Sequence, residues 1–506
     1  MTPTRSMFAL GIAATVAALA APLALAGPAD AATEPCDSSR PYRDLNGDGF
    51  EDVVVGDPEA TVAGQPEAGT VTILFGDAEG VMGGGSRRVL TQTDLGETPE
   101  AGDHFGWAVA ANRTSIDGCY GIIIGSPGED VDGKVDAGMG HVLTINGGPN
   151  DDIEQELIDN VDQGDVGGNV EAGDEFGYSV AALGGSDEYP VTFAFGAPGE
   201  NNDGGVVNRT DDLGRPSAAV QERQGSRGLP GTLQAGDRFG EVIQFLNYLP
   251  VADAEDFYLY VGAPGDRVDG HTAAGSVTAI SKYARSRLIT ENTSGVPGKA
   301  EAGDRFGSSL SGSELPPLSS LRQFAIGVPG EDVGKVKDAG SVTVLKRYGP
   351  TSILKAITLT QSTSGVAGIV ESGDQFGSAV AYRDDRTLVI GIPGEDVGRV
   401  PDAGGAQILR IGISQLSFPS PFITEDSPGT PGAVRVGNRF GAAVAGLPSN
   451  DSVSVNQPRD YGEAVFAITS PNQDGGSVYV LSSTEESRAW QPGPEQTGAR
   501  FGQSVG

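Results

Sequence analysis

The sequence predicts an all-β fold, a seven-bladed β-propeller whose blades each contain four strands. A Phe-Gly pair recurs seven times at intervals of 61 to 71 residues, and a Gly-x-Pro-type motif alternates with it along the chain. Both motifs adjoin short β-branched runs bounded by Gly, Pro and Asp, which is the pattern of strands rather than helices. Radial repetition of such units is typical of propeller blades.

Each repeat supplies four strand-like runs. The first is the Phe-Gly run, in 105-FGWAV, 176-FGYSV, 239-FGEVI, 306-FGSSL, 376-FGSAV, 440-FGAAV and 501-FGQSV. The second is 54-VVGDP, 123-IIGSP, 194-AFGAP, 260-YVGAP, 325-AIGVP, 389-VIGIP and 467-AITSP. The third resembles 339-AGSVTVL, and the fourth is a threonine-rich run such as 357-ITLTQ.

The order of the motifs predicts how the ring closes. The first unit begins with the second motif, at 52-DVVVGDP-58, whereas the last Phe-Gly run, 501–506, has no second motif after it. We therefore expect the C-terminal strand to complete blade one and remove an exposed sheet edge. The expected propeller spans 44–506, with blade one at 44–95 plus 501–506, and the others at 103–162, 174–226, 237–294, 304–364, 374–427 and 438–492.

Residues 502–506 read G-Q-S-V-G, the pattern of a hydrolase nucleophile elbow, which would make Ser504 catalytic. Sibling units also accept Ala or Val at the same position: the equivalents of Ser504 are Ala108, Ser179, Val242, Ser309, Ala379 and Ala443. The elbow also requires a helix after the serine, so a packing position on an inner strand is the better interpretation.

The N-terminus has the features of a secretory signal peptide, assigned to 1–31 and followed by a short segment, 32–43. A basic residue, Arg5, precedes the apolar run 7–26 and the small-residue step Ala29-Asp30-Ala31. A membrane anchor is the alternative, because the run is nearly long enough to span a bilayer. We expect a secreted mature chain without a membrane span.

In an oxidising compartment, Cys36 and Cys119 would form one disulfide, and two free thiols are the alternative.

Charge narrows the choice of partners. The formal net charge is −35, from 68 acidic and 33 basic residues. Such a surface repels nucleic acid and anionic lipid and favours cations or basic ligands. A surface that serves only solubility is the alternative.

The stretch 44-DLNGDGFED-52 predicts a calcium site. Asp44, Asn46, Asp48, the Phe50 carbonyl and Asp52 occupy alternate positions of a loop, with a glycine at its turn. Hard oxygen ligands at this spacing wrap one Ca²⁺ ion. Val55 stands where an EF-hand has glutamate, so Asp52 would be the bidentate ligand. An Asx-rich hairpin without an ion is the alternative.

A second acidic set follows the Gly-x-Pro motif in three blades. The sequence places these turns on the face from which the Phe-Gly strands start, where they would form a ring that holds cations or a basic ligand. Solvated turns shaped by Gly and Asp are the alternative. The residues are Glu129, Asp130, Asp136, Glu331, Asp332, Asp338, Glu395, Asp396 and Asp402.

The paired motifs resemble the FG-GAP repeats of the integrin α-subunit head over about residues 42–506. The resemblance implies an extracellular propeller that binds partners through loops on one face and calcium through hairpin loops on the other. Blade seven departs from the motif, with Thr469-Ser470-Pro471 in place of Gly-x-Pro-Gly.

We therefore expect a monomeric, calcium-stabilised module that binds an extracellular protein or glycan or serves in cell adhesion. A hydrolase of esterase, phospholipase or glycosidase type that uses the propeller face is one alternative, and a structural envelope protein is another. The enzyme inventory is thin, because none of the three histidines (His104, His141 and His271) lies at metal-ligand spacing from another. No catalytic residue is assigned.

Overall fold

The structure is a computed structural model of the chain, in which residues 36–506 form one compact unit. It describes residues 44–46, 52–76, 87–113, 120–147, 153–184, 191–213, 216–247, 257–281, 285–313, 321–348, 353–412, 416–417, 421–428, 430–447, 465–472, 475–481, 488–491, 500, 502 and 504–505. The predicted signal peptide and the segment 32–43 lie outside these residues, as do Cys36, Cys119, Asp48 and Phe50.

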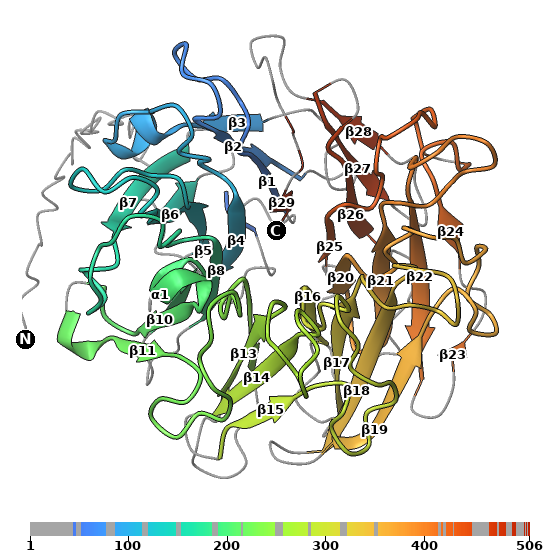
Figure 1. The fold of residues 1–506 in the computed structure, drawn as a ribbon. Helices are drawn as coiled ribbons and strands as arrows, with labels where there is room; N and C mark the ends of the chain where they lie inside the picture. Colours follow the sequence, from blue (N-terminus) through green and yellow to red (C-terminus); the bar gives the residue numbers. More distant parts are fainter. Residues whose placement is uncertain are drawn as a thin grey trace, which may run out of the picture. The chain divides into compact units, whose positions relative to one another are not determined.

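Seven antiparallel sheets stand side by side around a central axis and confirm the seven-bladed propeller (Figure 1). Blade one holds β29 (Ser504–Val505), β1 (Val53–Asp57), β2 (Thr70–Leu74) and β3 (Arg87–Leu90). Blade two holds β4 (Ala108–Arg113), β5 (Tyr120–Ser126), β6 (Met139–Gly147) and β7 (Ile153–Val161). Blade three holds β8 (Ser179–Leu183), β9 (Thr192–Ala197), β10 (Val206–Thr210) and β11 (Val220–Glu222).

Blades four, five and seven repeat the plan from the inner strand outwards. Blade four holds β12 (Val242–Asn247), β13 (Phe257–Ala263), β14 (Ser276–Ser281) and β15 (Arg287–Ile289). Blade five holds β16 (Ser309–Gly312), β17 (Leu321–Val328), β18 (Ser341–Tyr348) and β19 (Ile353–Leu359). Blade seven holds β25 (Val444–Leu447), β26 (Val465–Ser470), β27 (Ser477–Leu481) and β28 (Arg488–Trp490).

Blade six has a divided outer strand. After β20 (Ala379–Tyr382), β21 (Thr387–Ile392) and β22 (Gly405–Ile411), both β23 (Leu416–Ser417) and β24 (Phe422–Ile423) pair with β22. Pro419 and Pro421 between them lack the N–H that a continuous strand would donate.

Helix is scarce in the described part of the chain. It consists of two 3₁₀ turns, η1 (Gln92–Leu95) and η2 (Pro216–Ala218), and α1 (Glu200–Asp203). In α1, Asn201 and Asn202 have φ values of 57° and 58°. None of these is long or apolar enough to cross a membrane.

The predicted ring closure is confirmed. β29 pairs antiparallel with β1, through Val55 with Val505 and Gly56 with Ser504. The Ser504 hydroxyl donates to the carbonyl oxygen of Gly106 at 2.8 Å, and Ser179 and Ser309 make the same bond to the next blade at 2.7 and 2.8 Å. Ser504 is therefore a strand residue that joins blade one to blade two.

The glycines of the two motifs mark where neighbouring blades touch. A Cβ on Gly56, in the Gly-x-Pro motif of blade one, would lie 2.0 Å from the carbonyl oxygen of Gly106, in the Phe-Gly motif of blade two. Gly106 itself has φ of 91°, which favours glycine. The pairing recurs between blades, for example at Gly125 with Gly177, so the motif repeats because backbone packs against backbone there.

The hydrophobic core is divided among the spaces between blades. One cluster joins Val54 and Ile73 of blade one to Phe105 and Ile122 of blade two. The Phe-Gly phenylalanines of blades two to seven are all fully buried at such junctions. Each blade therefore needs its neighbour, as in other repeat architectures.

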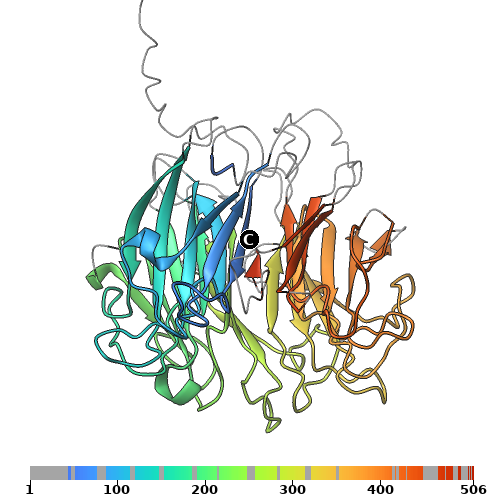
Figure 2. The same cartoon turned by 90° about the horizontal axis from the view of Figure 1, so that it is seen from above.

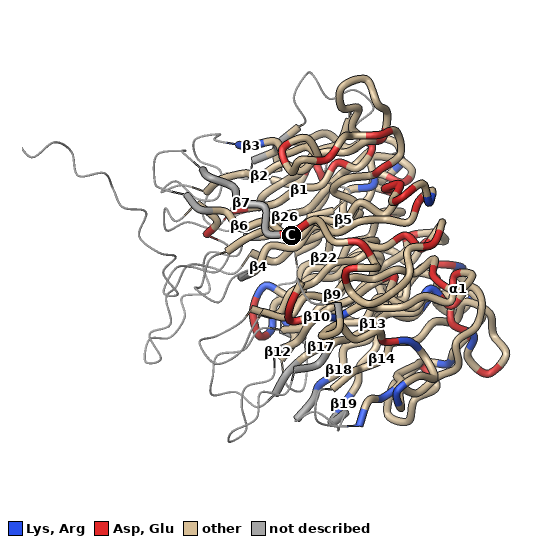
Figure 3. The backbone as a smooth tube through the Cα atoms, turned by 90° about the vertical axis from the view of Figure 1, so that its left-hand side faces the viewer, with Lys and Arg blue, Asp and Glu red and all other residues tan. Residues whose placement is uncertain are grey.

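The strand directions separate two faces. Ala108, at the start of β4, pairs with Gly125 near the end of β5, so the Phe-Gly turns and the loops after the second strands share a face. These loops gather at the lower side of Figure 2. Figure 3 shows acidic residues on them, including the turn at α1, and we call this side the turn face.

Candidate functional site

The turn face carries a ring of variable positions around the propeller axis. They are the residue before each Phe-Gly pair and the residue after it, and we call this ring the mouth. The residue before the pair has φ between 53° and 58° in blades two to seven, so its side chain is held in a fixed backbone setting. The described mouth residues are His104, Glu175, Arg238, Arg305, Gln375, Arg439 and Arg500, with Trp107, Tyr178, Glu241, Ser308, Ser378 and Ala442.

On one side of the mouth, aromatic and charged side chains form a continuous belt. The rings of His104 and Trp107 lie 5.7 Å apart, and those of Trp107 and Tyr178 lie 5.2 Å apart. The Arg238 guanidinium stands 5.1 Å from the centre of the Tyr178 ring, a cation–π geometry.

Ion pairs hold the arginines of this belt in place. Arg238 pairs with Glu241 at 2.5 Å and with Glu175 at 3.0 Å, and Arg305 pairs with Glu241 at 3.4 Å. Because these pairs are partly exposed, each contributes little stability and serves mainly to orient the side chains.

The other side of the mouth opens into a pocket of about 590 Å³. Arg439, Arg500, Gln375 and Ser378 from the ring line it, together with Asp402 and Asn472 from the loops of blades six and seven. Arg439 is exposed, whereas Arg500 pairs with Glu59 at 3.0 Å. The volume falls in the range of pockets that hold small ligands.

Behind the mouth, the inner strands enclose a second cavity along the axis. Its volume is about 310 Å³, and its walls are mainly alanine, valine and glycine, such as Ala111, Ala182 and Gly446. Asn112, Gln244 and Arg383 add polar groups.

The structure separates the acidic residues predicted to form a cation face. In each of the three turns, the first aspartate accepts the backbone N–H of the second at 3.0 Å, as Asp130 does from Asp136. The second aspartate has positive φ (53°, 50° and 47° in Asp136, Asp338 and Asp402). The two aspartates therefore shape a hairpin, and Asp402 alone of the nine residues lines the mouth pocket.

The glutamates of the same turns point elsewhere, into the junctions between blades. Glu129 is 7% exposed and accepts the amide of Gln92, which follows the outer strand of blade one, at 2.5 Å. Burial, and then the nearby carboxylate of Asp103, raises the pKa of Glu129 to about 8. Glu395 accepts from Gln361 in the same way, and burial raises its pKa to about 7.

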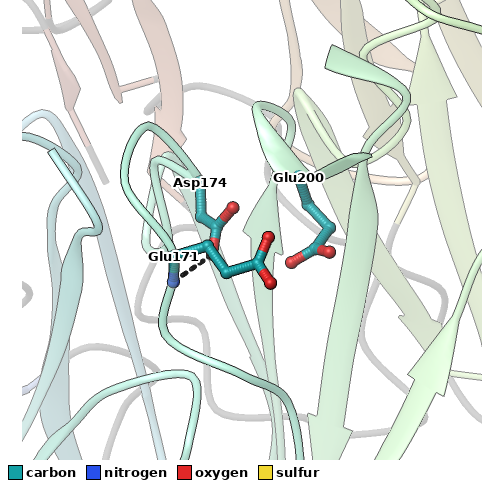
Figure 4. Close-up of side chains that lie close together, drawn as sticks. All are labelled: Glu171, Asp174 and Glu200. Atoms are coloured by element: carbon teal, nitrogen blue, oxygen red, sulfur yellow. Dashed lines mark hydrogen bonds between the residues drawn. The ribbon is translucent and has the colours of Figure 1, made fainter. Parts of the chain in front are cut away.

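The junction between blades two and three gathers three carboxylates, Glu171, Asp174 and Glu200 (Figure 4). Asp174 accepts the backbone N–H of Glu171 at 2.9 Å, and Glu200 accepts the amide of Gln163 at 2.8 Å. Burial, followed by the charge of Glu200, raises the pKa of Asp174 to about 7.

The described residues of the predicted calcium loop lie on the face opposite the mouth, where β1 begins. Asp44, Asn46 and Asp52 are 1%, 4% and 0% exposed. Asp52 accepts the backbone N–H of Leu45 at 2.7 Å through Oδ2 and that of Gly76 at 3.0 Å through Oδ1. This carboxylate ties the loop to the end of β2, and calcium binding by the loop stays a prediction.

Blade two contains a Ser-His-Asn chain with the connectivity of a hydrolytic triad. Ser126 Oγ lies 2.9 Å from His141 Nε2, and His141 Nδ1 lies 2.8 Å from Asn160 Oδ1. Ser126 and His141 are both 0% exposed, and burial lowers the pKa of His141 to about 4. A substrate has no access to this buried serine, so the three hydrogen-bonded side chains contribute to the packing of blade two.

Sequence reasoning did not identify the mouth. The signal was the third residue of the Phe-Gly run, which is Trp, Tyr, Glu, Ser, Ala or Gln in otherwise similar copies. The residue type at the position of His104 differs between blades, which argues against one chemical role shared by all of them. A binding surface adapted to one particular ligand would show the same variation.

Comparisons with known proteins agree with the repeat. The family described as "FG-GAP repeat" matches residues 42–74. A phosphatidylinositol-glycan-specific phospholipase D from Dictyostelium discoideum is 29% identical over 92 residues, which are 17% of this chain and 10% of that protein. The chain thus spans about a tenth of the length of this relative.

Two solved structures share a distant likeness. The fucose-specific lectin from Aleuria aurantia has a TM-score of 0.38 at 8% identity, over 76% of this chain and 94% of the lectin. Oligopeptidase B from Trypanosoma brucei has a TM-score of 0.34 at 10% identity, over 83% of this chain and 44% of the peptidase. At these scores neither structure bears on the ligand of this chain.

Proposed function

We propose that this chain, an FG-GAP-repeat β-propeller, is an exported binding module that holds an extracellular protein or glycan at its mouth. The observation that carries the proposal is the 590 Å³ pocket, because half of its lining comes from mouth positions that vary while the blade framework repeats: Gln375, Ser378, Arg439, Ala442 and Arg500. A scaffold that fixes its backbone and varies its rim is the usual arrangement of a binding surface.

The chemistry of the mouth suits a polar ligand with some flat apolar surface. Arg439, Asp402 and Asn472 offer donors and acceptors at the pocket, and Trp107 and Tyr178 supply aromatic rings on the other side of the mouth. Trp, Tyr and Arg are also the residues that contribute most to protein–protein binding energy. Adhesion to a cell surface would follow if the ligand is itself attached to cells.

The proposed calcium ion would support the module rather than bind the ligand. The described residues of its loop lie at the face opposite the mouth, where Asp52 joins residues 45–46 to the end of β2. An ion held by Asp44, Asn46, Asp48, the Phe50 carbonyl and Asp52 would stiffen blade one, where the ring closes.

A binding screen tests the proposal. The mature protein, with calcium present, would be applied to immobilised glycans, matrix proteins and whole cells. Arg439→Ala removes the exposed arginine of the pocket and should weaken binding about tenfold, or ~1.4 kcal/mol. Arg267→Ala removes an exposed arginine from the turn face in blade four and should leave binding unchanged.

Two results would contradict the proposal. Equal losses in Arg439→Ala and Arg267→Ala would assign the binding to overall charge instead of the pocket. Binding that survives Arg439→Ala together with Asp402→Ala, in a protein with unchanged melting temperature, would place the ligand elsewhere.

A further inference from the structure

The seven blade junctions offer an internal comparison, because the same three positions meet at most of them. The first position follows the outer strand of one blade, the second is the acid before the next Phe-Gly pair, and the third is the acid of the next Gly-x-Pro turn. In four junctions the first position is glutamine, whose amide donates to the third position. These bonds join Gln92 to Glu129, Gln163 to Glu200, Gln224 to Asp266 and Gln361 to Glu395, at 2.5, 2.8, 3.0 and 2.5 Å.

Two junctions have glutamate at the first position instead. Between blades six and seven, Glu425 accepts hydrogen bonds from the side chains of Asn438, Ser470 and Tyr479. The junction between blades four and five differs: its first position is Glu291, two residues after β15, and a carboxylate replaces the amide donor. Glu291 is 2% exposed, and neither of its carboxylate oxygens has a hydrogen-bond donor. Oε2 of Glu331 also lacks a donor, whereas Asp304 accepts the backbone N–H of Glu301.

The three carboxylates point at one another. Oxygens from Glu291, Asp304 and Glu331 all lie within 4.8 Å of one another. No ion pair with lysine or arginine relieves them within the described part of the chain. Buried like charges at this separation are strongly unfavourable unless protons or a cation neutralise them.

We propose that Glu291, Asp304 and Glu331 bind a hard divalent cation, Ca²⁺ or Mg²⁺, at the junction of blades four and five. Carboxylate oxygens are the preferred ligands of both ions. Oxygens on opposite sides of a calcium ion lie about 4.8 Å apart, twice a Ca–O distance of about 2.4 Å, whereas those around magnesium lie about 4.1 Å apart. Oxygens within 4.8 Å of one another can therefore all reach one ion of this size.

The blade two–three junction in Figure 4 is the natural control. It also brings together three carboxylates, but Gln163 donates to Glu200, and Glu171 is exposed to solvent. Its charge is relieved without an ion, so it carries no such proposal. The site at Glu291 is also separate from the loop at Asp44 and does not depend on the proposed ligand function.

The test measures bound metal and melting temperature on the full mature chain, first stripped with chelator and then dialysed against Ca²⁺ or Mg²⁺. Glu291→Gln installs the residue that four sibling junctions already contain. We expect it to bind one ion fewer per chain than the wild type and to melt at a higher temperature than the wild type in chelator. Glu171→Gln should change neither quantity.

A reciprocal variant guards against misfolding as an explanation. Gln361→Glu gives the junction between blades five and six the same three carboxylates, with Asp374 and Glu395, and should add one bound ion per chain. Equal metal content and equal metal-dependent melting shifts in wild type and Glu291→Gln would overturn the proposal. The Ca²⁺ and Mg²⁺ arms identify the ion, and a variant of the Asp44 loop should leave the effect of Glu291→Gln intact.

Discussion

The imidazole ring of His141 lies inside blade two, between Ser126 and Asn160. Its place in the repeat explains why it is there. The third strands of blades one to six carry a buried polar residue at this position, and Thr72, Asn208 and Gln407 are examples from other blades, whereas blade seven has Tyr479. The repeat could have predicted a structural role for His141, because a position filled by threonine or glutamine in sibling blades has no shared chemistry to perform.

A fall in pH should lower the free energy of unfolding, because the His141 ring is buried in its neutral form. Burial lowers the pKa of His141 from 6.5 to about 4, so the unfolded chain takes up the proton before the folded one does. The stabilising effect is complete above pH 6.5 and is lost as the pH falls toward 4. Between pH 7 and pH 5 the wild type should lose about 2 kcal/mol more than His141→Gln, measured by denaturant unfolding.

The glutamine variant uses the residue that Gln407 already places at this position in blade six. Raised carboxyl pKa values, such as that of Glu129, act in the opposite direction and are common to both proteins. Parallel pH profiles for the two proteins would contradict the prediction.

Among the strands, the inner three of each blade were predictable and the outer one less so. The inner strands follow the motifs because glycine contacts such as Gly56 against Gly106 fix where one blade meets the next. Outer strands have solvent on one side and few constraints, so β11 and β28 are short and blade six divides its edge into β23 and β24.

The contacts between blades could not be predicted in the same way. Gln92 meets Glu129 across 37 residues and two blades, and no local pattern encodes that distance. The sequence predicts the acidic turns as a repeated feature. It does not predict that their aspartates shape the hairpins while their glutamates lie in the junctions between blades, because that difference depends on packing.

Removal of the closing strand tests the role of β29. Deletion of 501–506 removes the pairing with β1 and the Ser504 bond to Gly106, and it leaves Val55 and its neighbours at an open edge. We expect a loss of at least about 3 kcal/mol and a tendency to aggregate, measured by calorimetry and light scattering.

A point change in the same strand provides the control. Ser504→Ala removes one hydrogen bond and should cost within about 1 kcal/mol. A truncated protein that melts with the wild type would contradict the closing role of β29.

At the scale of the whole molecule, the predicted calcium ion and the closing strand act on the same blade from opposite faces. The loop holds the start of β1 through Asp52, and β29 holds its end. Blade one is thus held at β1 by a loop and by a short strand pairing, and we expect it to unfold before the other blades. An ion bound in the loop should therefore affect the melting temperature of the entire ring.

Chelation should therefore lower the melting temperature in a way that depends on this loop. Calcium at about 100 times its dissociation constant would add about 2.7 kcal/mol to the free energy of unfolding. Asp48→Ala, in a Glu291→Gln background, should abolish the remaining response to chelator. Asp48 is the better choice than Asp52, because the Asp52 carboxylate also accepts backbone N–H groups from Leu45 and Gly76. A response that persists in the double variant would contradict a calcium site in the loop.

The shared blade also sets an order of events during synthesis. Blades two to seven can each fold from residues that leave the ribosome consecutively, but β1 emerges long before its inner partner, residues 504–505. Until those residues are made, the nascent chain therefore carries a strand with unpaired N–H and C=O groups, close to other nascent chains on the same messenger. A chaperone that covers blade one until residues 504–505 are made would protect this intermediate, and slow codons before those residues would lengthen the time for which it is exposed.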